Sequence, residues 1–173
     1  ILREGALISS ASLSNGAGGD VIVNAEELLE TDSNRPGAFL PTGILNNTIF
    51  GNGEGGDIVV QTRRFVQRGG SLLVTNSGVV LPTTIVQAGG PGGDITINAS
   101  ESVEISGTSA DGSITSGPGT TTFGPSPAGD LTINTQRFVA EGGAIISSAT
   151  LGAGDGGRLR VNASESVEVR GTS

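Results

Sequence analysis

The sequence predicts an all-β fold, a right-handed parallel β-helix (solenoid) of about five coils with three short strands each. Three observations predict it. A Gly-Gly-Asp step followed by an alternating apolar triplet recurs along the chain. Apolar residues within each unit follow a period of two, and no helical period of 3.6 residues occurs.

The repeat has anchors near residues 20, 57, 94, 130 and 158, which are spaced by 37, 37, 36 and 28 residues. Two kinds of unit alternate. One carries Asn-Ala-Ser-Glu-Ser-Val-Glu, at 98–104 and 162–168, and the other carries Arg-Phe-Val, at 64–66 and 137–139. We expect residues 1–173 to form a single β-helix segment in which each unit makes one coil. Since neither end resembles a cap, we expect a longer repeat array.

The first strand of each coil follows its anchor. Val21 and Val23 point to one side and Ile22 to the other, which is the alternation of a half-buried strand. Equivalent strands of successive coils should pair in parallel about 4.8 Å apart. The expected interior stacks are Val21/Ile58/Ile95/Leu131/Leu159 and Val23/Val60/Ile97/Ile133/Val161.

Two further strands complete each coil. The second includes Val103–Ile105, with Glu104 outward, and its counterparts Phe65 and Phe138 are expected to point inward. The third is expected near the apolar residues Leu7, Leu72, Ile114 and Ile145. Corners with positive φ are expected at glycines, namely Gly107, Gly142, Gly143, Gly156 and Gly157.

The longer units carry their extra length near the third strand and the corner after it. All seven prolines lie there, and because Pro cannot donate to a ladder these stretches should leave the coil. Such inserts form either an interaction face or loops without a partner. The prolines are Pro36, Pro41, Pro82, Pro91, Pro118, Pro125 and Pro127, and the same interpretation places Thr120–Thr122 in an insert.

Two other features narrow the fold. Parallel crossovers are right-handed by default, which sets the expected hand. A β-propeller also repeats at about 40 residues, but each blade needs four antiparallel strands and the Trp-Asp signature is absent.

Composition excludes several functions. The net charge of −8 makes nucleic acid and anionic membrane surfaces poor partners. The chain has no Cys and no His, so it offers no thiolate nucleophile, no Ser-His-Asp triad and no zinc or copper site of the ordinary type. No apolar run of about 18 residues occurs, and we therefore expect no membrane-spanning segment.

Three stretches of the chain resemble the stalk repeats of filamentous haemagglutinin-like exoproteins, and most closely the large cyanobacterial group. They are Gly-Gly-Asp-Ile-Thr-Ile-Asn-Ala at 92–99, Val-Glu-Ile-Ser-Gly at 103–107 and Gly-Gly-Ala-Ile-Ile-Ser-Ser-Ala-Thr-Leu-Gly-Ala-Gly-Asp-Gly-Gly at 142–157. The resemblance implies a right-handed β-helical stalk, exported across the outer membrane by a partner-secretion route. The fibre would be displayed at the cell surface or shed, and the expected location is therefore extracellular.

An aspartate column should stack one coil apart: Asp20, Asp57, Asp94 and Asp130. One interpretation is calcium bound along a corner, because hard oxygen ligands suit that cation. The other, which we favour, is an Asx-type turn exposed to water. We therefore expect no metal and no cofactor.

An asparagine column should form a structural amide ladder at a corner: Asn24, Asn98, Asn134 and Asn162, with Gln61 substituting in one coil. Stacked amides hydrogen-bond along the stacking axis. Asn46, Asn98 and Asn162 also fit the Asn-x-Ser/Thr glycosylation pattern, which is a weak signal in a chain rich in Ser and Thr.

These observations favour a structural or adhesive segment of a secreted cell-surface fibre, and not an enzyme. Expected partners are other copies, end to end or laterally, and cell-surface glycans or other cells. The alternative is a polysaccharide-acting β-helix enzyme, a lyase or hydrolase, using Glu104 with Glu168 or Glu26 with Glu30. We expect no catalytic residue, because these carboxylates recur at equivalent positions and a unique site should break the repeat.

Overall fold

The computed structural model describes residues 1–34, 41–81, 84–86 and 89–171 of the chain. These residues form fourteen β-strands and contain no helix, so the all-β expectation is confirmed. The strands make a seven-stranded sheet, a five-stranded sheet and a two-stranded ribbon.

The strands of the seven-stranded sheet are β1 (Leu2–Arg3), β3 (Val21–Asn24), β4 (Leu28–Asp32), β6 (Ile58–Arg68), β10 (Ile95–Ser106), β12 (Leu131–Glu141) and β14 (Leu159–Val169). Those of the five-stranded sheet are β2 (Leu7–Ser12), β5 (Gly43–Thr48), β7 (Leu72–Ser77), β11 (Gly117–Thr122) and β13 (Ser147–Thr150). The ribbon consists of β8 (Val79–Leu81) and β9 (Thr84–Val86).

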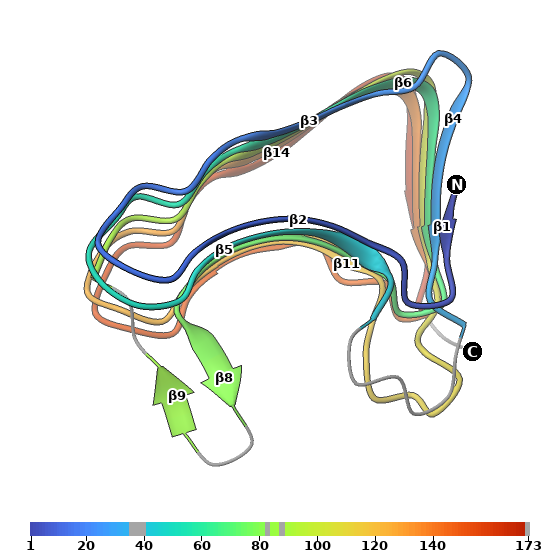
Figure 1. Ribbon diagram of the computed structural model, residues 1–173. Helices are drawn as coiled ribbons and strands as arrows, with labels where there is room; N and C mark the ends of the chain where they lie inside the picture. Colours follow the sequence, from blue (N-terminus) through green and yellow to red (C-terminus); the bar gives the residue numbers. More distant parts are fainter. Residues whose placement is uncertain (35–40, 82–83, 87–88, 172–173) are drawn as a thin grey trace.

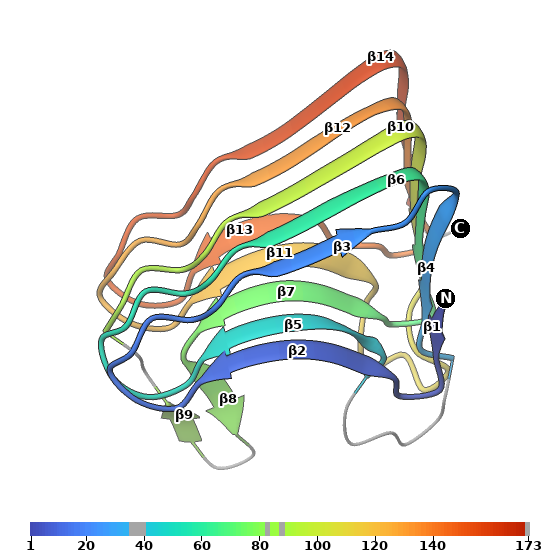
Figure 2. The ribbon, with the colours of Figure 1, turned by 45° about the horizontal axis from the view of Figure 1, so that its top comes forward.

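The chain passes alternately through the two large sheets, and every strand pair within them is parallel. We call one traverse of the seven-stranded sheet, together with the following strand of the five-stranded sheet, a pass. Successive passes lie side by side in sequence order, as Figures 1 and 2 show. The two sheets face each other and enclose the hydrophobic core.

The register of the seven-stranded sheet matches the expected stacks. Ile58 pairs with Val21 and Ile95, and Leu131 pairs with Ile95 and Leu159. The second stack, through Val60, Ile97 and Ile133, follows the same register. Ile58, Ile95 and Leu131 are fully buried, as are the three residues of the second stack, because alternate side chains of each strand face the core.

The expected first and second strands run together in four of the passes, which corrects the expectation of three short strands. In β6, β10, β12 and β14 a single strand continues through the corner, and only β3 and β4 remain separate. The register shifts at that corner between Asn98 and Ser102 of β10, a β-bulge at which the sheet bends sharply (Figure 1). Phe65 and Phe138 lie beyond the bend and point inward as expected.

The third strand starts later than expected in two passes. Ile114 and Ile145 precede β11 and β13, whereas Leu72 and Leu7 begin β7 and β2 as predicted. The sequence analysis also missed β5 (Gly43–Thr48). The inward positions of β5 and β11 carry polar residues as well as apolar ones, so no alternation of hydrophobicity marks these two strands.

Pro118 and Thr120–Thr122 lie in β11, which corrects their placement in an insert. Gly117 donates its backbone N–H to Ser71 beside β7. The backbone nitrogen of the next residue, Pro118, therefore faces β13. On that side Ile145 donates its N–H to Ser116, but Pro118 has no N–H to continue the ladder, and regular pairing with β13 begins only at Gly119.

The extra length of the longer passes falls at two corners, not one. Residues 108–115 form a loop before β11, closed by an isolated bridge between Thr108 and Thr115. The β8–β9 ribbon leaves the body after β7, at the opposite end of the five-stranded sheet (Figure 1). Pro36 and Pro82 lie outside the described residues.

Glycine serves two different purposes at the corners. Gly107, Gly142 and Gly143 have positive φ as expected. Gly156 and Gly157 do not, which corrects that expectation. A Cβ on Gly157 would instead overlap the carbonyl oxygen of Gly129 one pass earlier, so the Gly-Gly-Asp step is needed for close approach between passes.

Candidate functional site

The Asp column is a ladder between passes and not a turn cap. Each carboxylate Oδ1 accepts the backbone N–H of the next anchor residue, at 3.0 Å from Asp20 to Asp57 and at 2.8 Å from Asp57 to Asp94. Asp94 accepts from Asp130 in the same way, and Asp130 accepts from Arg158. The bond requires only a backbone N–H from the anchor residue of the next pass. Arg158 can therefore take the place of Asp at the fifth anchor.

This geometry bears on the calcium interpretation. Each carboxylate already uses one oxygen to accept a backbone N–H of the neighbouring pass. Among the described residues, no group of three or more acidic side chains is placed to hold a metal ion. The residues named for calcium therefore form a backbone ladder here.

The Asn column lies in register through all five passes, with Gln61 between Asn24 and Asn98. Asn134 donates from Nδ2 to Oδ1 of Asn98 at 2.8 Å, and Asn162 donates to Asn134 at the same distance. These three residues form an amide ladder. Gln61 is one methylene longer than Asn, which carries its amide beyond the line of the column.

Inward polar side chains of the five-stranded sheet form a third ladder, which the sequence analysis missed. Thr75 and Thr120 donate from Oγ1 to the carbonyl oxygens of Gly93 and Gly129, each at 2.6 Å. Asn46 occupies the same column and donates to Gly19 at 2.9 Å. These buried side chains satisfy carbonyl groups of the glycine-rich corner, which has few side chains of its own. Asn46 is fully buried, so the folded chain does not present it for glycosylation.

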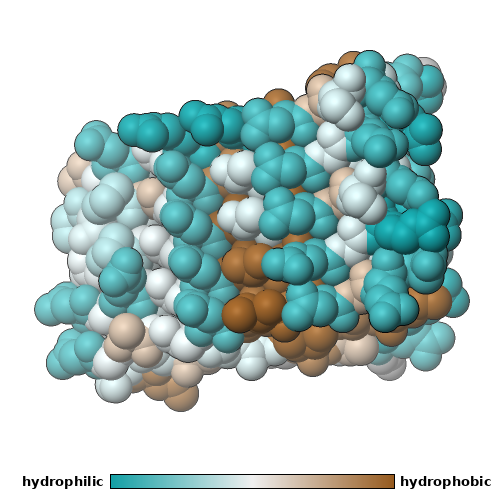
Figure 3. Space-filling view, turned by 90° about the horizontal axis from the view of Figure 1, so that it is seen from above, coloured by the Kyte–Doolittle hydropathy of each residue, from teal (hydrophilic) through white to brown (hydrophobic). Residues whose placement is uncertain are grey.

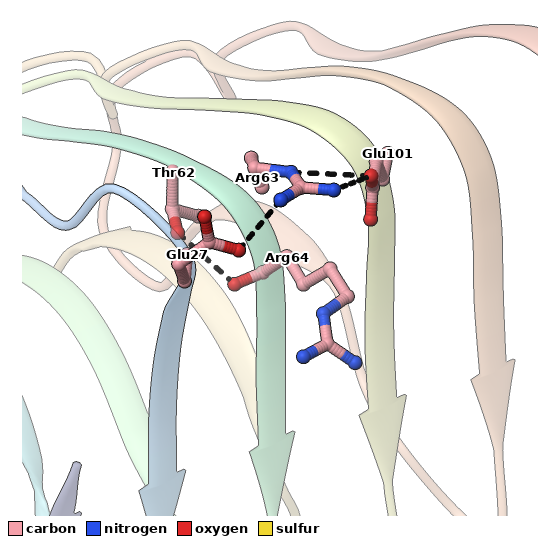
Figure 4. Close-up of polar contacts among 5 residues, drawn as sticks. All are labelled: Glu27, Thr62, Arg63, Arg64 and Glu101. Carbon is pink, nitrogen blue, oxygen red and sulfur yellow. Dashed lines mark hydrogen bonds and ion pairs between the residues drawn. The ribbon is translucent and has the colours of Figure 1, made fainter.

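The outer side of the seven-stranded sheet beyond the bend is a charged face. Arg63 of β6 lies between Glu27 of the preceding pass and Glu101 of the following one, and its guanidinium bonds to both (Figure 4). These contacts raise the pKa of Arg63, mainly through Glu101, and the Arg63 hydrogen bond lowers the pKa of Glu101. Further along, Arg170 bonds to Glu168 and Glu141, which raise its pKa in that order.

The carboxylates considered for catalysis belong to this face. Glu104 and Glu168 stand in one column with Val139 between them. Glu30 is 6% exposed and its Oε1 lies 2.9 Å from Arg3 and 3.3 Å from Arg68, so two guanidinium groups balance its charge. Glu26 is exposed and lies at the bend. The fold therefore does not bring either proposed pair together as an isolated site.

A groove follows the bend in the seven-stranded sheet. Two hollows of about 420 and 520 Å³ adjoin there and share Gln61, Thr62 and Ser100. Ala99 is 1% exposed and belongs to the hydrophobic core, so it places no side chain on the outer surface at this corner. The remaining lining residues are mostly amides and hydroxyls, namely Asn24, Ala25, Glu26, Arg63, Asn98, Asn134, Thr135 and Gln136.

Hydrogen bonds within the corner hold the groove in shape. Thr62 donates from Oγ1 to the carbonyl oxygen of Arg64 at 3.2 Å (Figure 4). Two passes later, Thr135 donates in the same way to the carbonyl oxygen of Arg137 at 3.3 Å. On the other side the Asn ladder fixes the orientation of the amides. We identify this groove as the candidate site, because it combines a hollow with oriented donors and acceptors.

No match was found for this chain among family models, curated proteins or solved structures. None of its described residues belongs to a helix long and apolar enough to cross a membrane.

Proposed function

We propose that this chain is a rigid structural and adhesive segment of a secreted cell-surface fibre, folded as a right-handed parallel β-helix with one coil per pass. The proposal follows the stalk repeats that the sequence resembles. The observation that carries it is the set of ladders along the stacking axis: the Asp ladder, the amide ladder and the inward hydroxyl column.

These ladders suit a load-bearing rod. Each pass is joined to its neighbours by backbone pairing and by side chains at more than one corner. The charged face adds Arg63, which bridges three passes through Glu27 and Glu101. Stability in such an array is close to a sum of unit and neighbour terms, and a fibre can therefore gain length by adding units.

A non-catalytic role is part of the proposal. Glu30 is held by two arginines, and Glu104 recurs as Glu168 two passes later. A repeated, charge-balanced carboxylate favours a solvated or bonded face over an acid–base pair.

Insertion of repeats tests the proposal. The variant carries three extra copies of residues 57–129 after Gly129, so that each junction restores a Gly-Asp step and keeps the two kinds of unit alternating. Each copy adds two passes, and the rod should lengthen by about 10 Å per copy at the spacing of paired strands. Small-angle X-ray scattering measures this length.

The control inserts a Gly/Ser segment of equal length at the same position, which should produce a flexible loop and no stepwise change in rod length. An inserted repeat that leaves the rod length unchanged, or that unfolds the chain, contradicts the proposal.

A further inference from the structure

We propose that the groove at the bend binds a neutral, extended polysaccharide chain that runs parallel to the stacking axis. This inference names the ligand class for the adhesive part of the proposed function and rests on it. The groove extends over several passes, because its two hollows share Gln61, Thr62 and Ser100. A shallow trough of this kind fits a linear polymer better than a compact ligand.

The chemistry of the walls matches sugar hydroxyls. The side chains of Gln61, Asn98 and Asn134 carry both a donor and an acceptor, as do the hydroxyls of Ser100 and Thr135. Sugar hydroxyl groups also donate and accept. Because the ladder uses one donor and one acceptor of Asn134, its second N–H and second lone pair remain directed along the surface.

The neighbouring surface supplies an apolar contact. Ile22 and Val59 stand in the outward column next to Asn24 and Gln61, and Ile22 is 64% exposed. Figure 3 shows hydrophobic surface beside a hydrophilic row on this side of the molecule. The column continues with Thr96 and Thr132 in the following passes. Pyranose rings have apolar C–H faces as well as hydroxyls, and the apolar pair lets part of one edge of the sugar chain lose water.

The charges point to a neutral ligand. Arg63 lines the groove, but its guanidinium is already bonded to Glu27 and Glu101. Glu26 adds an exposed carboxylate, and the chain has a net charge of −8. A polyanionic glycan would meet repulsion at this groove that a neutral one avoids.

Among the described residues, the groove has no aromatic platform, and this sets the expected strength. Phe65, Phe123 and Phe138 are buried, and the exposed Phe50 lines neither hollow. Without stacking, each short contact should be weak, with dissociation constants on the order of 1 mM. Repetition of the groove along an array would raise the avidity, since a long chain then engages many units at once.

The test uses three neutral hexasaccharides, cellohexaose, isomaltohexaose and chitohexaose, and a heparin-derived hexasaccharide as the polyanionic comparison. Binding is followed by nuclear magnetic resonance through the side-chain amide signals of Gln61, Asn98 and Asn134. We expect at least one neutral probe to shift these signals, with little dependence on salt.

A matched pair of variants locates the site. Ser100→Leu places a larger, non-aromatic side chain in the groove, and Ser164→Leu makes the same change in the same Asn-Ala-Ser motif outside both hollows. Both serines are exposed. Ser100→Leu should weaken binding by about tenfold or more and Ser164→Leu by less than twofold. Gln61→Ala, which removes one wall amide, should weaken binding without adding bulk.

Three outcomes would overturn the inference. They are no shift from any neutral probe at 10 mM, tighter and salt-dependent binding of the heparin fragment, or equal losses in the two leucine variants. Each leaves the rod proposal standing, because the length gained per inserted repeat is measured independently of any ligand.

Discussion

The two large sheets enclose one interior but contribute different chemistry to it. The seven-stranded sheet contributes apolar residues, such as Ile58, Ile97 and Phe138. The five-stranded sheet contributes Ile44 and Leu73 but also fully buried Thr75 and Thr120. The two sheets therefore stabilise the interior in different ways. The seven-stranded sheet excludes water, whereas the five-stranded sheet also supplies hydroxyl groups that hydrogen-bond to the carbonyls of a glycine-rich corner.

The largest loss of stability should come from a substitution in the apolar stacks of the seven-stranded sheet. Ile97→Asp places a carboxylate between Val60 and Ile133, where no partner is available to balance the charge. The variant should lose at least about 3 kcal/mol of unfolding free energy. Urea denaturation followed by circular dichroism measures the loss. An unfolding free energy within about 0.5 kcal/mol of the parent's would mean that the stack is not buried.

The polar side should give an intermediate effect. Thr75→Val keeps the shape of the side chain but removes the hydroxyl that donates to Gly93, and should cost about 1–3 kcal/mol. Thr132→Val is the matched control, because Thr132 points outward and is half-buried, and it should change stability by less than about 0.5 kcal/mol. Equal effects of the two substitutions would remove the distinction between the two sheets.

The apolar half of this comparison follows from the sequence and the polar half does not. Ile95, Thr96 and Ile97 alternate between apolar and polar, so the register of their stacks could be predicted. In β11 the sequence Gly-Pro-Gly-Thr-Thr-Thr has no alternation to read, although Thr120 and Thr122 are fully buried. Their burial depends on carbonyl groups contributed by residues that follow in the chain, and that dependence appears only in three dimensions.

The candidate site divides in a similar way. The Asn column was visible because the same residue type recurs at the same position after most of the anchors. The groove beside it was not, because it arises from the bend at the register shift after Asn98 and from the burial of Ala99 in the core at that bend. The alternation of Ala and Thr at positions 25, 62, 99, 135 and 163 is the sequence signal that could have located it.

The Asp ladder at the edge of the seven-stranded sheet should give a smaller effect. Asp94→Ala removes the acceptor for the backbone N–H of Asp130 and should cost about 1 kcal/mol, whereas Asp94→Asn keeps an acceptor oxygen and should cost less. A chelator should leave the melting temperature of the parent unchanged. A drop on chelation that calcium reverses would instead support the calcium interpretation.

The smallest effect is expected outside both sheets, in the loop before β11. Hydrogen bonds from the Ser109 hydroxyl, and then from Ser113, lower the pKa of Asp111 to about 2 from its ordinary value of 3.8. Because the pKa of Asp111 is lower in the folded state than in the unfolded state, its ionised carboxylate stabilises the fold. This stabilisation is complete above the unfolded pKa and is lost as pH falls from about 4 towards 2.

A titration of the Asp111 carboxyl carbon by nuclear magnetic resonance checks this, with a midpoint near 2 expected for the parent. Ser109→Ala should move the midpoint back towards 3.8. A parent midpoint already at that value would show that the loop does not hold the carboxylate.

The stacking of passes in the register found before the bend is tested most directly by cross-linking, because the chain has no cysteine of its own. Thr96 and Thr132 face each other on adjacent strands, whereas Arg160 lies one strand further along the same column. The double variant Thr96→Cys/Thr132→Cys should be bridged by a short reagent with two thiol-alkylating arms, each of which forms a thioether and loses its halide, and which fluoresces only when both arms have reacted. Thr96→Cys/Arg160→Cys should not be bridged. Equal bridging of the two pairs, or none in the folded 96/132 variant, would contradict the account.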